Sequence, residues 1–284
     1  MTSPNNSNTA RAAARTSGEF IADAALTETV LNGRASLADR RRARRLLGLE
    51  SRRPLRVAAI SVARTCDPVL EAQMLVEQVS RMPEVRIAPC GELALMFIQP
   101  RRADDSTVSD ICTALRQSHP RRFADGSLRM GVGGSVAPTV AEKSWEQAIV
   151  ALRFAAPRAS GTPALAGRPL VKYDKLGVFA LLAKIPRAEL RDQRDVRALE
   201  ELANTDMGDL DIAALQAFCR TGSLRSAAQE LYVHHSTVAD RLGRAAGVLG
   251  WHLDDPTDRF RAQFALCALR LADSPPDHGT FSPP

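Results

Sequence analysis

The chain of 284 residues has few aromatic residues, only four lysines and no long apolar segment. Phenylalanine, tryptophan and tyrosine together make up 5% of it, so a core must be built mainly from aliphatic side chains and alanine. No segment approaches the roughly 20 apolar residues that a membrane-spanning helix needs. The polar segment Met1–Ser17 also lacks the apolar stretch of a secretory signal. The sequence therefore predicts a cytoplasmic protein with no membrane partner.

Cysteine occurs in an odd number and never as a Cys-x-x-Cys pair. The five cysteines are Cys66, Cys90, Cys112, Cys219 and Cys267. Scattered single cysteines fit a reducing compartment better than a disulfide framework or a zinc site. The adjacent His234 and His235 do not change this expectation, because no cysteine or carboxylate beside them completes a ligand set. We expect no metal and no cofactor.

The formal net charge is +6, but the basic excess is unevenly distributed. Residues 209–284 contain 7 basic and 9 acidic residues, whereas residues 18–208 contain 29 basic and 23 acidic ones. Net charge is thus no argument for nucleic-acid binding by the C-terminal region. A module with so little positive charge should bind DNA weakly, because phosphate neutralisation supplies much of the affinity. Pairing of two modules in a dimer would compensate for the weak binding of each one.

The C-terminal region nevertheless contains the pattern of two helices joined by a tight turn. Gly222 and Ser223 have the residue types of a helix stop followed by an N-cap. Apolar residues recur at helical spacing in Leu224–Leu231 and again from Val238 to Leu249. A short helix that holds a longer one with a polar N-terminal half is typical of the helix-turn-helix, whose second helix enters the DNA major groove.

The second helix, expected over His235–Leu249, presents polar side chains away from its apolar stripe. We expect base or phosphate contacts in its first turn, and we expect His234 to act as its N-cap. For Arg241 and Arg244 two interpretations stay open, contact with phosphates or pairing with Asp240 or Glu230. The candidate DNA-binding residues are Ser223, Arg225, His235, Ser236, Thr237, Arg241 and Arg244.

The middle of the chain predicts an α+β domain over residues 55–155. Strands are expected at Leu55–Val62, Val85–Pro89, Glu92–Gln99 and Leu128–Val136, and helices at Val69–Met82, Ser106–Ser118 and Ala141–Ala155. The order β-α-β-β-α-β-α is that of a ferredoxin-like sheet. Gly131, Gly133 and Gly134 do not match a nucleotide-binding motif, and close packing of the backbone explains them better.

Other segments flank these two domains. We expect a disordered tail over residues 1–17, a helical lead-in over 18–54, a linker with connecting helices over 156–208, an all-α helix-turn-helix domain over 209–273 and a Pro-rich tail over 274–284. The lead-in and the start of the next domain carry eight arginines between Arg40 and Arg56. They are interpreted either as a solvated helix face or as a patch for phosphates or an acidic partner.

The C-terminal residues also carry a more specific signal. The helix-turn-helix of PucR/CdaR-type bacterial transcription regulators has a skeleton that this chain resembles from Ala227 to Leu242, where it reads Ala-Ala-Gln-Glu-Leu-Tyr-Val-His-His-Ser-Thr-Val-Ala-Asp-Arg-Leu. Upstream, Leu128–Ala155 resembles the end of that family's degenerate GGDEF-like domain, and Val171–Leu182 resembles its connecting segment. The resemblance covers roughly residues 19–272 and implies a regulator that dimerises and binds promoter DNA.

Two positions of the second helix depart from the family's pattern. Family members usually carry Arg-Asn where this chain has His235-Ser236, and an aromatic or basic residue near Ala239-Asp240. The groove-facing surface is therefore expected to be less cationic. Asp240 should repel phosphates, although a carboxylate can accept a hydrogen bond from cytosine N4.

In the central domain the resemblance implies that nucleotidyl cyclase chemistry is lost. Where an active member shows Gly-Gly-Asp-Glu-Phe, this chain reads Pro-Cys-Gly-Glu-Leu over residues 89–93. The end of the first expected strand, Ile60-Ser61-Val62, has no carboxylate either. Phosphoryl transfer of that kind needs metal ions held by acidic groups. We expect no catalytic residues and no enzymatic activity.

Together these patterns predict a sequence-specific transcriptional regulator that binds double-stranded promoter DNA as a homodimer and associates with the nucleoid when bound. A small-molecule effector is left open. One alternative is a protein-interaction regulator that kept the fold but lost DNA binding, which salt-sensitive DNA binding would distinguish. A second is an enzyme or nucleotide sensor in the central domain, which a nucleotide-dependent thermal shift would reveal.

Overall fold

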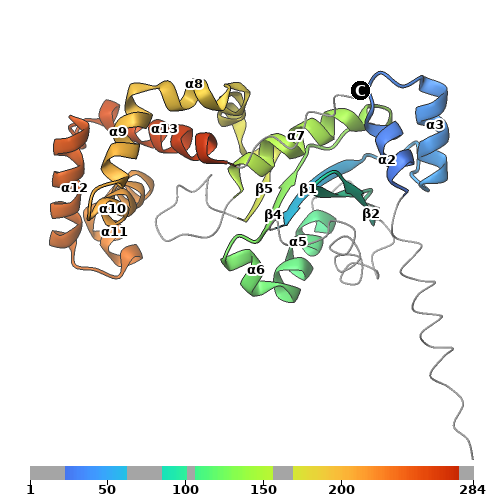
Figure 1. The fold of residues 1–284 in the computed structure, drawn as a ribbon. Coiled ribbons are helices and arrows are strands. Elements are labelled where there is room, and N and C mark those ends of the chain that lie inside the picture. The colour runs from blue at the N-terminus through green and yellow to red at the C-terminus, as the bar shows by residue number, and fades with distance from the viewer. Residues whose placement is uncertain (1–22, 63–84, 101–105, 156–168, 275–284) are drawn as a thin grey trace, which may run out of the picture. The chain divides into compact units, whose positions relative to one another are not determined.

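The computed structural model describes residues 23–62, 85–100, 106–155 and 169–274, which belong to two compact units (Figure 1). The first unit contains the described residues up to Leu152 together with Pro169–Lys175. The second contains residues 153–155 and the described residues from Leu176 to Ser274. Within the described ranges, no helix is long and apolar enough to cross a membrane.

The first unit is built on one sheet. Its strands are β1 (Arg56–Val62), β2 (Val85–Cys90), β3 (Leu93–Ile98), β4 (Leu128–Val132) and β5 (Leu170–Lys172), arranged in the order β2-β3-β1-β4-β5. β1 lies antiparallel between β3 and β4, and β5 extends the sheet parallel to β4. This arrangement confirms the predicted ferredoxin-like sheet and adds one edge strand. The helix predicted over Val69–Met82 lies outside the described residues.

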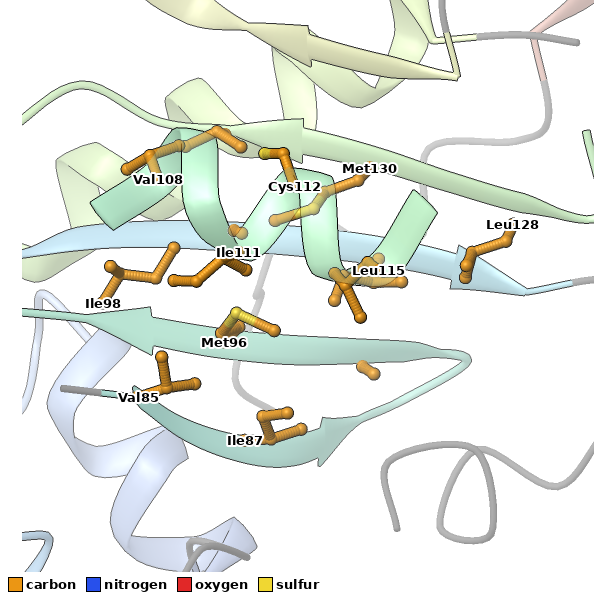
Figure 2. Close-up of a cluster of buried hydrophobic side chains, with 14 of the residues drawn as sticks. Val85, Ile87, Met96, Ile98, Val108, Ile111, Cys112, Leu115, Leu128 and Met130 are labelled. Atoms are coloured by element: carbon orange, nitrogen blue, oxygen red, sulfur yellow. The ribbon is translucent and has the colours of Figure 1, made fainter. Parts of the chain in front are cut away.

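Helices cover both faces of the sheet (Figure 1). α5 (Ser106–Ser118) and the short α6 (Pro120–Ala124) lie on one face, and α7 (Ala141–Phe154) lies on the other. Figure 2 shows the core on the α5 side, where Ile111 and Leu115 of α5 meet Met96 of β3. Alternate residues of β1 to β4 point into this layer, as the period of two in a strand requires.

On the opposite face, glycines let the backbone of α7 approach β4. A Cβ atom on Gly133 would lie 1.9 Å from the carbonyl oxygen of Ser144, and one on Gly131 would lie 2.2 Å from the carbonyl oxygen of Ala148. The Ser144 hydroxyl accepts a hydrogen bond from the backbone N–H of Val57 (2.9 Å) and donates one to the carbonyl of Gly134 (2.8 Å). Close backbone packing, as predicted, accounts for these glycines.

Two helices precede the sheet, α2 (Ala24–Leu31) and α3 (Leu37–Leu46). The side chain of Asp23 caps α2, and the hydroxyl of Ser36 caps α3 by accepting from the backbone N–H of Asp39 at 3.1 Å. Residues 32–36 separate the two helices, so the predicted helical lead-in consists of two pieces.

The second unit is entirely helical. A 3-10 helix, η3 (Gly177–Lys184), is followed by α8 (Arg187–Asp192), α9 (Arg194–Ala203), α10 (Gly208–Thr221), α11 (Leu224–Leu231), α12 (His235–Leu249) and α13 (Pro256–Asp273). The predicted connecting helices are interrupted at Gln193, which takes an extended conformation (φ −65°, ψ 133°) between α8 and α9. Leu199 of α9 packs into the same core as α10 to α13, so this helix is part of the module that holds the turn.

The half-buried Cys219 and the buried Cys267 and Cys90 give a first testable prediction. Burial raises the pKa values of Cys219 and Cys267 to about 11, and that of Cys90 in the first unit equally. At pH 8 a thiol with that pKa is only about 0.1% thiolate, which is the reactive form. In a Cys66→Ser background we expect alkylation by iodoacetamide, located by peptide mass spectrometry, to be about 100-fold slower at these three sites than in urea-unfolded protein. Labelling of the native protein at the rate of free cysteine would contradict this.

Candidate nucleic-acid interface

The turn between α11 and α12 is fixed by local capping. Gly222 ends α10 in the left-handed conformation (φ 71°), and the Ser223 hydroxyl accepts from the backbone N–H of Ser226 at 3.1 Å. Tyr232 ends α11 as the one described non-glycine residue with a positive φ (54°), and its side chain is 94% exposed. The predicted stop at Gly222 and cap at Ser223 are confirmed.

The N-terminus of α12 is capped by a histidine. Nδ1 of His234 accepts from the backbone N–H of Ser236 at 3.3 Å and lies 2.8 Å from the Ser236 hydroxyl. The rings of His234 and His235 lie 4.1 Å apart, and both residues are exposed. The predicted N-cap role of His234 is confirmed. Because the first backbone N–H groups of a helix have no intrahelical acceptor, this exposed end is suited to an anion.

A buried apolar stripe holds α12 against the neighbouring helices. Val238, Leu242 and Ala245 pack toward α10 and α11, and the small side chains of Ala227 and Ala228 let α11 cross closely. The opposite face of α12 consists of the exposed residues Ser236, Asp240, Gly243 and Gly247. At about 100° per residue these four fall on one side of the helix. That face carries the negative Asp240, and its one positive side chain is Arg244, four residues later at the edge of the face.

The basic and hydroxyl candidates lie beside this face. Thr237 and Arg241 are half-buried and four residues apart, so they share one side of α12. Arg225 of α11 is exposed. Among the described residues, neither arginine has an ion-pair partner. Both guanidinium groups therefore keep their hydrogen-bond donors available for an external anion.

Arg244 is committed to a partner within the chain. Its Nε and Nη2 donate to the two carboxylate oxygens of Asp211, at 3.0 and 2.6 Å, and Asp211 at the start of α10 is only 2% exposed. The hydrogen bonds to this carboxylate raise the pKa of Arg244. Of the two interpretations from the sequence, intramolecular pairing is observed, but with Asp211 rather than with Asp240 or Glu230. Glu230 pairs instead with Arg220.

Sequence reasoning missed Asp211 as a positioning residue. It lies 33 positions before Arg244, so no helical spacing links them. The position of Asp211 on α10 could have indicated this role, because Asp211 falls on the same side of the helix as the buried Ala214 and Leu215. An acidic residue on a buried stripe requires a cationic partner.

The turn of the central domain that corresponds to the cyclase motif is a tight hairpin. Cys90 ends β2, Leu93 begins β3, and Gly91 between them takes a positive φ of 59°. Within the described ranges, no three His, Cys, Asp or Glu side chains gather in a way that could hold a metal ion.

Comparison with known proteins gives a family match within each of the two units. A GGDEF-like domain matches residues 32–154, and a PucR C-terminal helix-turn-helix domain matches residues 212–268. A solved structure that is similar is the regulator of polyketide synthase expression from Bifidobacterium adolescentis, with 24% identity, 88% of this chain and 100% of that chain covered, and a TM-score of 0.39. No curated protein matches the chain. The chain therefore belongs to the PucR type of transcription regulator, in which a GGDEF-like domain precedes a PucR C-terminal helix-turn-helix domain.

Proposed function

We propose that this protein regulates transcription by reading promoter DNA in the cytoplasm with α12, as a sequence-specific homodimer and without enzymatic activity of its own. The observation that carries the proposal is the capped α11–turn–α12 unit, whose second helix has a buried stripe and an exposed polar first turn. Helices of this geometry enter the major groove with their N-terminal residues toward the base edges. The match of residues 212–268 to the PucR helix-turn-helix supports the same function.

Different residues take different parts in this proposal. His235 and Ser236, exposed in the first turn of α12, are assigned to base edges, and Asp240 one turn later to a cytosine N4. Thr237 and Arg241 are assigned to phosphates beside the groove. Ser223 and Arg225, at the exposed start of α11, are assigned to the DNA phosphate backbone on the other side of the groove. Arg244 instead positions α12 by fixing it to Asp211 of α10.

A homodimer is proposed because one module is poorly equipped to bind alone. Residues 209–284 carry 7 basic and 9 acidic side chains, and three of those basic groups, Arg220, Arg244 and Arg261, are already paired. Two modules on adjacent half-sites would double the number of phosphate and base contacts. Analytical ultracentrifugation with and without operator DNA would measure the stoichiometry.

The test begins with DNA of unknown sequence. The purified full chain is incubated with sheared genomic DNA from its source at two salt concentrations, and the retained fragments are sequenced. A shared repeated motif supplies an operator for titration. We then expect Thr237→Ala and Arg241→Ala each to weaken binding by about 1–3 kcal/mol, with unchanged far-UV circular dichroism.

Arg197→Ala is the matched control for this experiment. Arg197 is an exposed arginine of α9 that pairs with Asp192, so its loss removes the same charge without touching the assigned interface. It should leave affinity for the operator unchanged within about 0.5 kcal/mol. Equal affinity of the Thr237, Arg241 and control variants would disprove the assignment of α12.

A second candidate function is supported by the charge of the exposed face. Because the exposed side of α12 carries Asp240, and its one cation, Arg244, is already paired with Asp211, this module also suits a protein partner and a regulator that no longer binds DNA. The two functions differ in one observable. A DNA-reading regulator retains duplexes in a salt-sensitive manner, whereas an interaction regulator retains none even at low salt.

A further inference from the structure

The arginines of α3 are divided between two opposite sides of the helix. Arg40 and Arg44 point inward and are buried. The guanidinium of Arg40 donates to the carbonyl of Thr139 (2.7 Å) and to the Glu142 carboxylate, and that of Arg44 donates to the carbonyl of Pro138 (3.1 Å). These bonds fasten α3 to η1 (Pro138–Val140) and to the start of α7. The helix is thereby held in one orientation on the first unit.

The three remaining arginines of α3 point outward. Arg41, Arg42 and Arg45 are exposed, and among the described residues none of them has an ion-pair or hydrogen-bond partner. At about 100° per residue they fall within an arc of about 100°, so they form one strip. The acidic residue of α3, Asp39, is engaged at the N-terminus, where it accepts from the Ser36 hydroxyl at 2.7 Å. We call Arg41, Arg42 and Arg45 the α3 arginine strip.

An unpaired strip of like charges works against its own helix. Arg41 and Arg45 are four residues apart and Arg42 and Arg45 are three apart, which are the spacings at which helix side chains meet. Like charges at these spacings destabilise a helix. A face that served only solubility would gain stability from interspersed carboxylates. The strip is therefore arranged for an anion that comes from outside the first unit's described residues.

We propose that the α3 arginine strip binds phosphates of the DNA that the second unit reads, and thereby supplies positive charge that the second unit lacks. This inference rests on the proposed function. Guanidinium groups bind phosphate oxygens through several N–H donors at once, and no lysine occurs in this stretch. The module with α12 has more acidic than basic residues, so an accessory cationic surface would raise its affinity most.

The apolar residues of α3 favour a polyanion over a protein or a lipid surface. Leu37 and Leu46 are exposed, at 74% and 62%, but they lie at the two opposite ends of α3 and at the margins of the arginine arc. Within its arc the strip therefore offers only the small side chain of Ala38, and no large apolar surface of the kind that a protein interface or a bilayer would bury. Separate exposed leucines of this kind are ordinary on protein surfaces.

The salt dependence of DNA binding tests the strip. Binding of the full chain to the selected operator, and to a random duplex of the same length, is measured by fluorescence anisotropy over a range of KCl concentrations. For Arg41→Gln/Arg45→Gln we expect the slope of log K against log [KCl] to become shallower by about 2, because each lost phosphate contact removes about 0.9. Affinity should fall about tenfold or more at low salt for both duplexes alike, because phosphate contacts carry no sequence information.

A charge-matched variant and a conservative variant complete the design. Arg191→Gln/Arg197→Gln removes two exposed arginines that already have carboxylate partners in the second unit, and it should leave the slope unchanged. Arg41→Lys/Arg45→Lys should restore most of the slope. If the parent protein binds DNA and the strip variant keeps its slope, the inference is overturned while the proposed function stands, and an acidic protein becomes the candidate partner. If the parent binds no duplex at any salt concentration, the proposed function and the inference both fail.

Discussion

A Leu242→Asp variant is expected to lose the folded α10–α13 region while the sheet of the first unit stays folded. Leu242 is 7% exposed and lies in one core with Val238, Ala227 and Phe218. Removing a buried leucine costs about 2–5 kcal/mol, and an unpaired carboxylate in its place adds the penalty of a buried charge. The sum approaches the whole stability of an ordinary domain. Hydrogen exchange with mass spectrometry should show lost protection in peptides from α10 to α13 and retained protection in β1 and β3.

Val248→Asp is the matched control for this variant. Val248 lies on the same helix six residues later, but its side chain is 51% exposed and it is not part of the core. The same aspartate there should change stability by no more than about 0.5 kcal/mol. Native exchange protection in the Leu242→Asp protein would mean that the apolar stripe does not hold α12 against α10 and α11. The proposed interface on α12 would then have to be abandoned.

Gly133→Ala is expected to destabilise the first unit by about 3 kcal/mol or more. The added methyl would lie 1.9 Å from the carbonyl oxygen of Ser144 and 2.7 Å from its carbonyl carbon. These are backbone atoms of α7, so the helix as a whole must move away from β4. Movement would also break the hydrogen bonds that the Ser144 hydroxyl makes with Val57 and Gly134. Overpacking of this kind usually costs 1–3 kcal/mol, and about 1 kcal/mol more is expected for each buried hydrogen bond lost.

Gly33→Ala separates this steric effect from the general effect of replacing a glycine. A Cβ atom on Gly33 would find its nearest neighbour, Cγ of Glu142, at 3.8 Å, which is ordinary contact, and Gly33 is not among the glycines with positive φ. Urea unfolding followed by circular dichroism should therefore give Gly33→Ala a stability equal to or slightly above that of the parent. A Gly133→Ala protein as stable as Gly33→Ala would show that α7 does not pack on β4 as described.

The bounds and caps of α12 could be predicted from the sequence because their determinants are local. α12 begins at His235 and ends at Leu249 as predicted, and the caps at Ser223 and His234 each connect atoms two or three residues apart. The strand order of the first unit also followed from the sequence, because one pattern of alternating strands and helices allows few sheet topologies. The connecting helices could be predicted only as part of residues 156–208, and the sequence pattern did not show that one of them, over Gly177–Lys184, is a 3-10 helix.

The sequence by itself determined that this chain combines a ferredoxin-like sheet with a helix-turn-helix, since periodicity, caps and turn residues act within a few positions of each other. Only the tertiary structure decided which arginines are available. Arg44 and Arg45 are neighbours in the sequence, yet one is buried against a carbonyl and the other is exposed. Arg241 and Arg244 lie on one side of α12, yet only Arg244 meets a buried carboxylate. The number of charges can be counted from the sequence alone. The partner of each charge is set by packing between helices that are far apart in the sequence, and this packing determines which arginines stay available for an external anion.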